Sequence, residues 1–246
     1  SNTGYLITDF SPLKVYKKRL NKIIEDIEIP VDMVDAHNII PAWIVSDKQE
    51  FAAHTIRRKI HILLDSFLHS FPKVISHPFN VNIEHETIDP DAILRELQID
   101  NSVQEVNWIN PGENEGKRSL KTYLNERMDV TGESRNDPNK DSLSNLSPYI
   151  HFGQLSAQEI ALQVIATEDS VGKDTFLEQL IVRRELSDNF CYYNDDYDSF
   201  NGFHSWAQKT LNEHREDQRE YLYSSSEFEN ANTHDKLWNA AQHQMI

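Results

Sequence analysis

Two short apolar runs separated by a helical segment open the chain, and this arrangement limits its fold more than any other feature. The runs cover residues 5–8 and 29–34. Ser11 can cap the helix between them and Pro12 can occupy its first position, with an end near Ile27. A strand–helix–strand unit builds a parallel sheet, and such sheets are covered on both faces and are unstable with bare edges. We therefore expect the remnant of a larger α/β domain whose N-terminal side is missing.

Beyond this unit the apolar residues follow a helical period. Residues 48–71 predict one long amphipathic helix whose apolar face packs into a core. Three parts are expected: residues 1–75 end an α/β domain and carry the first connecting helix, residues 76–115 form a connector rich in proline and acids, and residues 116–246 form a helical domain. Ser156 starts a capping-box pattern within it. The fold class is therefore an α/β remnant followed by a mostly α-helical domain.

Two further helix starts are marked by capping residues. Asp174 or Thr175 can open a helix that continues to about Tyr193. Thr233 or Asp235 can open the final helix. No alternating strand pattern interrupts this part of the chain, so the second domain is expected to be all helical.

The charge of the chain restricts its partners. The formal net charge is −16, but residues 1–75 hold 10 Lys and Arg against nine Asp and Glu, which leaves 14 against 31 for residues 76–246. Phosphate contacts need Lys and Arg, so a nucleic-acid contact would require a local groove and would be weak or focused on a lesion. The single cysteine allows no internal disulfide, which favours a cytoplasmic protein, and no apolar run is long enough to span a membrane.

Several segments of the chain resemble class II DNA photolyases of the photolyase/cryptochrome family. The resemblance is carried by RNDP at 135–138, LSNLSPYIHFGQLSAQ at 143–158, FLEQLIVRRELSDNFCYY at 176–193 and THDKLWNAAQHQM at 233–245, with TDFSPL at 8–13 and VDAHNIIPAW at 34–43. Long strings in the family's order are far more specific than a short glycine motif. The resemblance covers essentially the whole chain.

This resemblance implies a fold and a reaction. The fold would be the end of a Rossmann-like antenna domain followed by the first half of a helical FAD-binding domain. The reaction would be light-driven repair of cyclobutane pyrimidine dimers by electron transfer from reduced FAD, with the lesion flipped out of damaged DNA into a pocket. Flipping costs least at a damaged base, which would let an acidic protein select lesions.

The resemblance also assigns candidate residues. By family, FAD contacts fall on Leu143, Ser144, Asn145, Leu146, Ser147, Phe176 and Arg183. The residues alone leave alternatives open, because serines beside a proline are often plain caps or turn residues. An arginine on a mixed helix face is often an ion-pair partner, so Arg183 or Arg184 could pair with Glu185 or Asp188.

Trp238 matches one tryptophan of the family's electron-transfer chain. Its alternative is simple packing of an apolar ring. Gln179 stands where the family carries the glutamate that contacts the lesion, and a glutamine cannot carry the negative charge or pass a proton, so repair should be weaker. The family's flavin-contacting tyrosine falls on Thr131.

The family's chain is longer at both ends, so we expect a truncated form. Such a chain would be inactive alone and colourless when purified, because about half of the walls of the flavin pocket would be missing. The alternative is a non-catalytic photolyase-like relic or module that binds DNA or a partner. An apolar surface left by truncation would favour a homo-oligomer. The histidines and the lone cysteine show no metal-ligand spacing, and no metal is expected.

Overall fold

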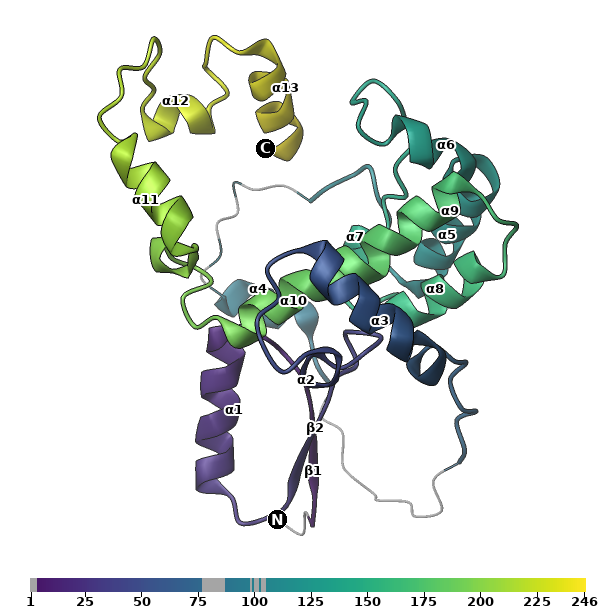
Figure 1. Ribbon diagram of the computed structural model, residues 1–246. Coiled ribbons are helices and arrows are strands. Elements are labelled where there is room, and N and C mark those ends of the chain that lie inside the picture. The colour runs from purple at the N-terminus through teal and green to yellow at the C-terminus, as the bar shows by residue number, and fades with distance from the viewer. Residues whose placement is uncertain (1–3, 77–86, 98, 100–101, 103–104) are drawn as a thin grey trace. The chain divides into compact units, whose positions relative to one another are not determined.

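The computed structural model describes residues 4–76, 87–97, 99, 102 and 105–246, which form two compact units (Figure 1). The first unit extends to Asp195, and the second covers residues 196–246. Most of the described secondary structure is helical, which confirms the expected predominance of helices. The described residues contain one small sheet, in the first unit.

The strand–helix–strand unit at the start of the chain is confirmed. Strand β1 (Leu6–Asp9) and strand β2 (Val31–Val34) pair in parallel, and helix α1 (Lys14–Asp26) connects them. Leu6 lies opposite Val31 in the register. After β1 the aromatic ring of Phe10 is buried, and it packs edge-on against Trp43 and Tyr192, with ring centroids 5.4 and 5.6 Å away. This cluster joins the sheet to the helical part of the first unit.

The predicted start of α1 at Ser11 and Pro12 is wrong. The helix begins at Lys14, and Leu13 before it is extended, with ψ 137°. One carboxylate oxygen of Asp9, Oδ1, accepts the backbone N–H of Phe10 at 2.8 Å and of Ala36 at 3.1 Å. These bonds tie the turn after β1 to the turn after β2, so the chain leaves the sheet extended before it can coil.

The helix predicted for residues 48–71 is shorter at both ends. Short helix α2 (Ala42–Val45) is followed by a non-helical loop, and helix α3 covers Ala53–Phe67. The loop is held by Asn189, which is fully buried. Its side-chain oxygen accepts the N–H of Glu50 at 2.7 Å, and its amide donates to the carbonyl of Lys48 at 3.0 Å. Backbone groups bound by a distant side chain cannot also enter a helix.

The helical part of the first unit surrounds its core. Its elements are α4 (Pro90–Glu96), α5 (Glu113–Glu126), α6 (Met128–Ser134), α7 (Ser147–His151), α8 (Ala157–Ile165), α9 (Val171–Leu177), η1 (Glu178–Arg183) and α10 (Arg184–Tyr193). Buried side chains of α3, α5, α8 and η1 form one cluster, which includes Ile56, Ile60, Leu120, Tyr123 and Ile160. Ser156 caps α8, as predicted, by accepting the N–H of Glu159.

The helix predicted to start at Asp174 or Thr175 begins one turn earlier. Ser170 caps α9 by accepting the N–H of Lys173 at 3.1 Å. The same rod then changes its hydrogen-bond pattern: η1 is a π-helix, and α10 resumes the ordinary pattern to Tyr193. The predicted C-terminal end is therefore right, but the rod is not α-helical throughout.

Helices α6 and α9 pack with their backbones in contact. A β-carbon placed on Gly172 of α9 would lie 1.8 Å from the carbonyl oxygen of Met128 in α6. Only glycine fits such an approach, because any side chain would push the two helices apart.

The second unit contains η2 (Phe200–Gly202), α11 (Ser205–Glu213), α12 (Ser225–Glu229) and α13 (Lys236–Met245). Asp235 caps α13 by accepting the N–H groups of Leu237 and Trp238 at 2.9 and 3.0 Å, as one of the two predicted starts requires. In neither unit is a described helix both long enough and apolar enough to cross a bilayer.

Candidate functional site

A cavity of about 250 Å³ in the first unit gathers most of the residues that the sequence singled out. It is lined by Leu143, Ser144, Asn145, Leu146, Ser147, Phe176 and Gln179, together with Tyr123, Thr131, Arg135 and Thr175. Residues 143–146 come from the loop before α7 and Ser147 is the first residue of that helix, whereas the others come from α5, α6, α9, η1 and the turn after α6. This cavity is called the smaller cavity below.

The loop of residues 143–147 turns sharply where it meets the smaller cavity. Asn145 has a φ of 56°, in the left-handed region that asparagine tolerates better than most residues. Leu146 is buried and anchors the loop in the core, whereas Ser147 begins α7 and is followed by Pro148. The loop therefore presents two serine hydroxyls and the start of a helix to one cavity, as a phosphate-bearing ligand would need.

Tyr123 and Thr131 form a hydrogen-bonded pair that contacts the residue before this loop, Ser142. The Tyr123 hydroxyl donates to Thr131 Oγ1 at 3.0 Å, and Thr131 Oγ1 lies 2.7 Å from the carbonyl oxygen of Ser142, to which it can donate. Burial raises the pKa of Tyr123. The Tyr123 ring is also close to Phe176, with centroids 4.9 Å apart. The Thr131 hydroxyl is thus engaged within the protein.

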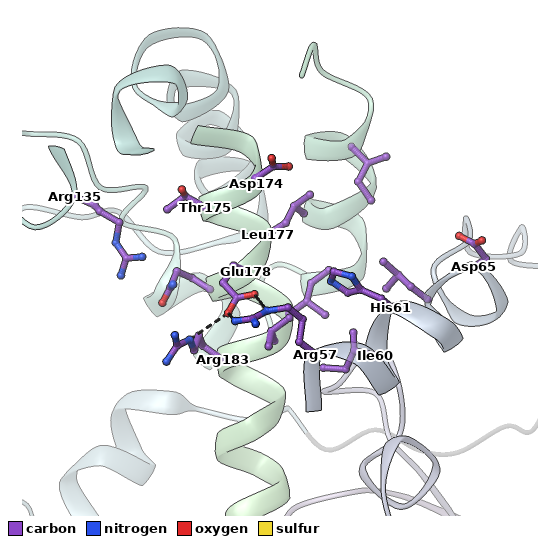
Figure 2. Close-up of a pocket in the computed structure, with 15 residues that line it drawn as sticks. Arg57, Ile60, His61, Asp65, Arg135, Asp174, Thr175, Leu177, Glu178 and Arg183 are labelled. Atoms are coloured by element: carbon purple, nitrogen blue, oxygen red, sulfur yellow. Dashed lines mark hydrogen bonds and ion pairs between the residues drawn. The ribbon is translucent and has the colours of Figure 1, made fainter. Parts of the chain in front are cut away.

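A larger cavity of about 890 Å³ adjoins the first and shares Arg135, Thr175 and Gln179 with it. One wall comes from α3, which contributes Arg57 and His61 among others, and the opposite wall comes from α9 and η1 (Figure 2). Both cavities are partly open to solvent. A cavity of this size is in the range of ligand sites in proteins.

Two arginines and one glutamate meet at the wall of the larger cavity. Arg57 binds both carboxylate oxygens of Glu178, with Nε–Oε2 at 2.9 Å and Nη2–Oε1 at 2.7 Å. Arg183 Nε donates to the same Oε1 at 3.3 Å (Figure 2). The hydrogen bond from Arg57 and the charges of both guanidiniums lower the pKa of Glu178, although burial acts in the opposite direction. Glu178 is therefore ionised near neutral pH.

The partner of Arg183 differs from those considered from sequence. Its acid is Glu178, five residues earlier, and not Glu185 or Asp188. In an α-helix side chains three and four residues apart are neighbours, but in a π-helix the backbone hydrogen bonds join residues five apart and the turn is wider, so residues i and i+5 lie closer to one face. Because η1 runs from Glu178 to Arg183, it brings these two side chains together. Arg184 does lie near Glu185, at 3.9 Å.

Three lining residues were missed by sequence reasoning. Arg57 lies on a helix that looks purely structural, and Glu178 looks like an ordinary surface acid, so no local signal marks either of them. Arg135 belongs to one of the quoted segments but had no role assigned. Its guanidinium lines both cavities, and within the described residues no carboxylate lies within ion-pair distance of it. It is thus free to meet an anion.

Trp238 lies in α13 of the second unit and is 38% exposed. Its ring packs on Phe228 with centroids 5.0 Å apart. The structure therefore places it in a small aromatic contact within the second unit.

The chemistry of the two cavities suits a ligand with an anionic part and a planar part. Arg135, Ser144 and Ser147 supply a cation and hydroxyls for anionic oxygens. Phe176 and Leu143 supply apolar surface for a ring. Among the described residues no three His, Cys, Asp or Glu side chains are grouped as a metal site.

Comparison with known proteins gives a consistent picture. No family model matches the chain. Among curated proteins, the chain is 47% identical over 249 residues to the deoxyribodipyrimidine photo-lyase of Potorous tridactylus, covering 99% of the chain and 46% of that protein. It is 40% identical to the rice protein of the same name, and 36% identical to that of Methanothermobacter thermautotrophicus, covering 50% and 53% of them. The chain thus spans about half the length of the curated relatives it matches.

Proposed function

Because the chain is similar along nearly all of its length to one part of deoxyribodipyrimidine photolyases, we propose that it carries a flavin-binding and lesion-facing portion of such an enzyme. The proposed reaction is light-driven cleavage of cyclobutane pyrimidine dimers in DNA, in an enzyme of class II. FAD, when bound, supplies the electron that splits the dimer. The strand–helix–strand unit is proposed to be the end of the Rossmann-like antenna domain.

The observation that carries this proposal is the convergence of the candidate residues on one cavity. Residues 143–147, Phe176 and Gln179 come from separate segments and line the same 250 Å³ space, which Arg135 also lines. We assign the phosphates of FAD to Ser144, Ser147 and Arg135. In this assignment Arg183, which lines the larger cavity, faces the flavin. Gln179, which lines both cavities, would contact the lesion.

The proposal predicts weak, measurable FAD binding by the isolated chain. Since both cavities are partly open, we expect a dissociation constant of about micromolar order and loss of the flavin during gel filtration, which leaves the protein colourless. Titration monitored by flavin fluorescence tests this. Arg135→Met should weaken binding about tenfold or more, because a charge-assisted contact is lost. Arg118→Met, on the exposed side of α5 in the same unit and not in the lining of either cavity, is the control. Absence of binding by the unmodified chain would refute the proposal.

A second candidate is a photolyase-like module that binds damaged DNA without repairing it. Two residues favour it: Gln179 lacks the carboxylate of the family's glutamate, and the Thr131 hydroxyl is engaged by Tyr123 and Ser142. A comparison of ultraviolet-damaged and intact duplex separates the candidates. Damage preference without FAD binding supports the module, whereas FAD binding or light-dependent repair supports the enzyme portion.

A further inference from the structure

Two guanidiniums and one carboxylate form a cluster at the wall of the larger cavity. Arg57 comes from α3, whereas Glu178 and Arg183 come from η1, so one carboxylate serves two guanidiniums from different elements. The Glu178 side chain is 22% exposed, compared with 39% for Arg57 and 55% for Arg183. The carboxylate is thus the most buried member of the cluster, and Arg183 is the most exposed.

The two arginines hold Glu178 unequally, and this difference indicates which side chain positions which. Arg57 grips Glu178 with two parallel bonds, a geometry that fixes both planes. Arg183 makes only one bond to Glu178, at 3.3 Å, and among the described residues it has no other side-chain partner. An arginine side chain has many rotamers, so one that is not held by a partner samples many positions. Arg183 therefore depends on Glu178, and Glu178 depends on Arg57.

We infer that Glu178 is a positioning residue, which holds the Arg183 guanidinium at the cavity wall so that it meets an anionic group of the ligand in one orientation. The ligand's identity as a flavin nucleotide rests on the proposed function. The π-helix is part of this device, because a spacing of five residues would separate the two side chains in an α-helix. Glu178 need not touch the ligand to act in this way.

Net charge alone predicts the opposite change in anion affinity for the Glu178→Gln variant. Glu178→Gln removes a negative charge and makes the wall more positive, so an anion should bind more tightly if only net charge matters. Positioning predicts weaker binding, because Arg183 must then be ordered at the moment of binding and Arg57 is left without its partner. The direction of the change therefore separates the two effects.

The first test is a double-mutant cycle on FAD affinity with the full chain. Glu178→Gln should weaken FAD binding about tenfold in the unmodified chain and by less than about twofold in an Arg183→Met background, since Glu178 acts through Arg183. Glu115→Gln, which breaks the exposed pair with Arg118 on α5, should leave the affinity unchanged. Tighter binding, no change, or equal weakening in both backgrounds would overturn the inference.

The second test needs no ligand. In nuclear magnetic resonance spectra of the arginine Nε–H groups, Arg183, identified through Arg183→Met, should give a rigid, shifted signal that becomes mobile in Glu178→Gln. The Glu115→Gln control should alter only the signal of Arg118. An Arg183 signal that is unchanged in Glu178→Gln would overturn the inference whether or not FAD binds. Failure of the unmodified chain to bind FAD, with the Arg183 signal behaving as expected, would instead refute the proposed function and keep the inference.

Discussion

Glu185 gives the sharpest prediction about how stability depends on pH. Its side chain is almost completely buried in α10, and one oxygen, Oε1, accepts the N–H of Ile39 at 2.8 Å and of Ile40 at 3.4 Å. The other oxygen, Oε2, has no hydrogen-bond partner in the part of the chain that the structure describes. Burial raises the pKa of Glu185 from 4.5 to about 7, although the two backbone N–H groups and Arg184 act against this rise. The ionised form is therefore poorly tolerated in the fold.

The sign and size of the effect follow from linkage. A carboxyl group with a higher pKa in the folded state binds its proton more tightly there, so the free energy of unfolding falls as pH rises between the unfolded and folded pKa values. A tenfold change in proton affinity is about 1.4 kcal/mol, and the rise from 4.5 to about 7 corresponds to roughly 3 kcal/mol. Glu185→Gln keeps an oxygen for Ile39 and removes the charge. The free energy of unfolding of Glu185→Gln, relative to that of the unmodified chain, should therefore rise by up to roughly 3 kcal/mol from about pH 4 to about pH 8.

Urea unfolding followed by circular dichroism at several pH values measures this difference. His37 Nε2 lies 3.1 Å from Asp188 Oδ2, and the interaction with this carboxylate raises the pKa of His37, so His37 also stabilises the fold more at low pH. Both proteins retain His37, and its contribution cancels in the comparison. A difference between the two proteins that is independent of pH, or that shrinks as pH rises, would refute the reasoning.

Two further variants test the packing of the first unit. Asn189→Ala should lower the free energy of unfolding by about 2–4 kcal/mol, because the N–H of Glu50 and a backbone carbonyl lose their buried partner; a loss below about 0.5 kcal/mol in urea unfolding would contradict this. Gly172→Ala should cost about 3 kcal/mol, since the new methyl group collides with the carbonyl oxygen of Met128. Gly4→Ala, where the β-carbon meets nothing within 4 Å, is its control, and equal melting temperatures for the two variants would count against the collision.

Local patterns predicted some of the elements whose ends are decided locally, although the local cap of α9 by Ser170 was missed. The parallel pair of strands around α1 follows from two apolar runs and a helical segment between them. Asp235 and Ser156 cap their helices with their own side chains, so a few neighbouring residues contain the whole signal. Such features need no knowledge of the distant chain.

Elements decided by distant residues were missed. The start of α3 depends on Asn189, which lies 139 residues beyond Glu50, and no pattern near residue 48 reveals it. The π-helix is also invisible locally, because its six residues fit an α-helix equally well by composition. Its first residue, Glu178, is bound by Arg57 of α3, and this contact between helices is not visible in the local sequence. The candidate residues 143–147, Phe176, Gln179 and Arg183 came from family resemblance, whereas Arg57 and Glu178 required the tertiary structure.

The contact of Gly172 with Met128 also acts as a spacer. Thr175 lies three residues after Gly172 on α9, and Thr131 lies three residues after Met128 on α6, and both threonines line the smaller cavity. The distance between Thr131 and Thr175 across the cavity is thus set by the backbone contact between α6 and α9. Side chains around the cavity can change the chemistry offered to a ligand while its span stays constant, and a single added methyl group at the spacer would widen it without altering any group that faces the ligand.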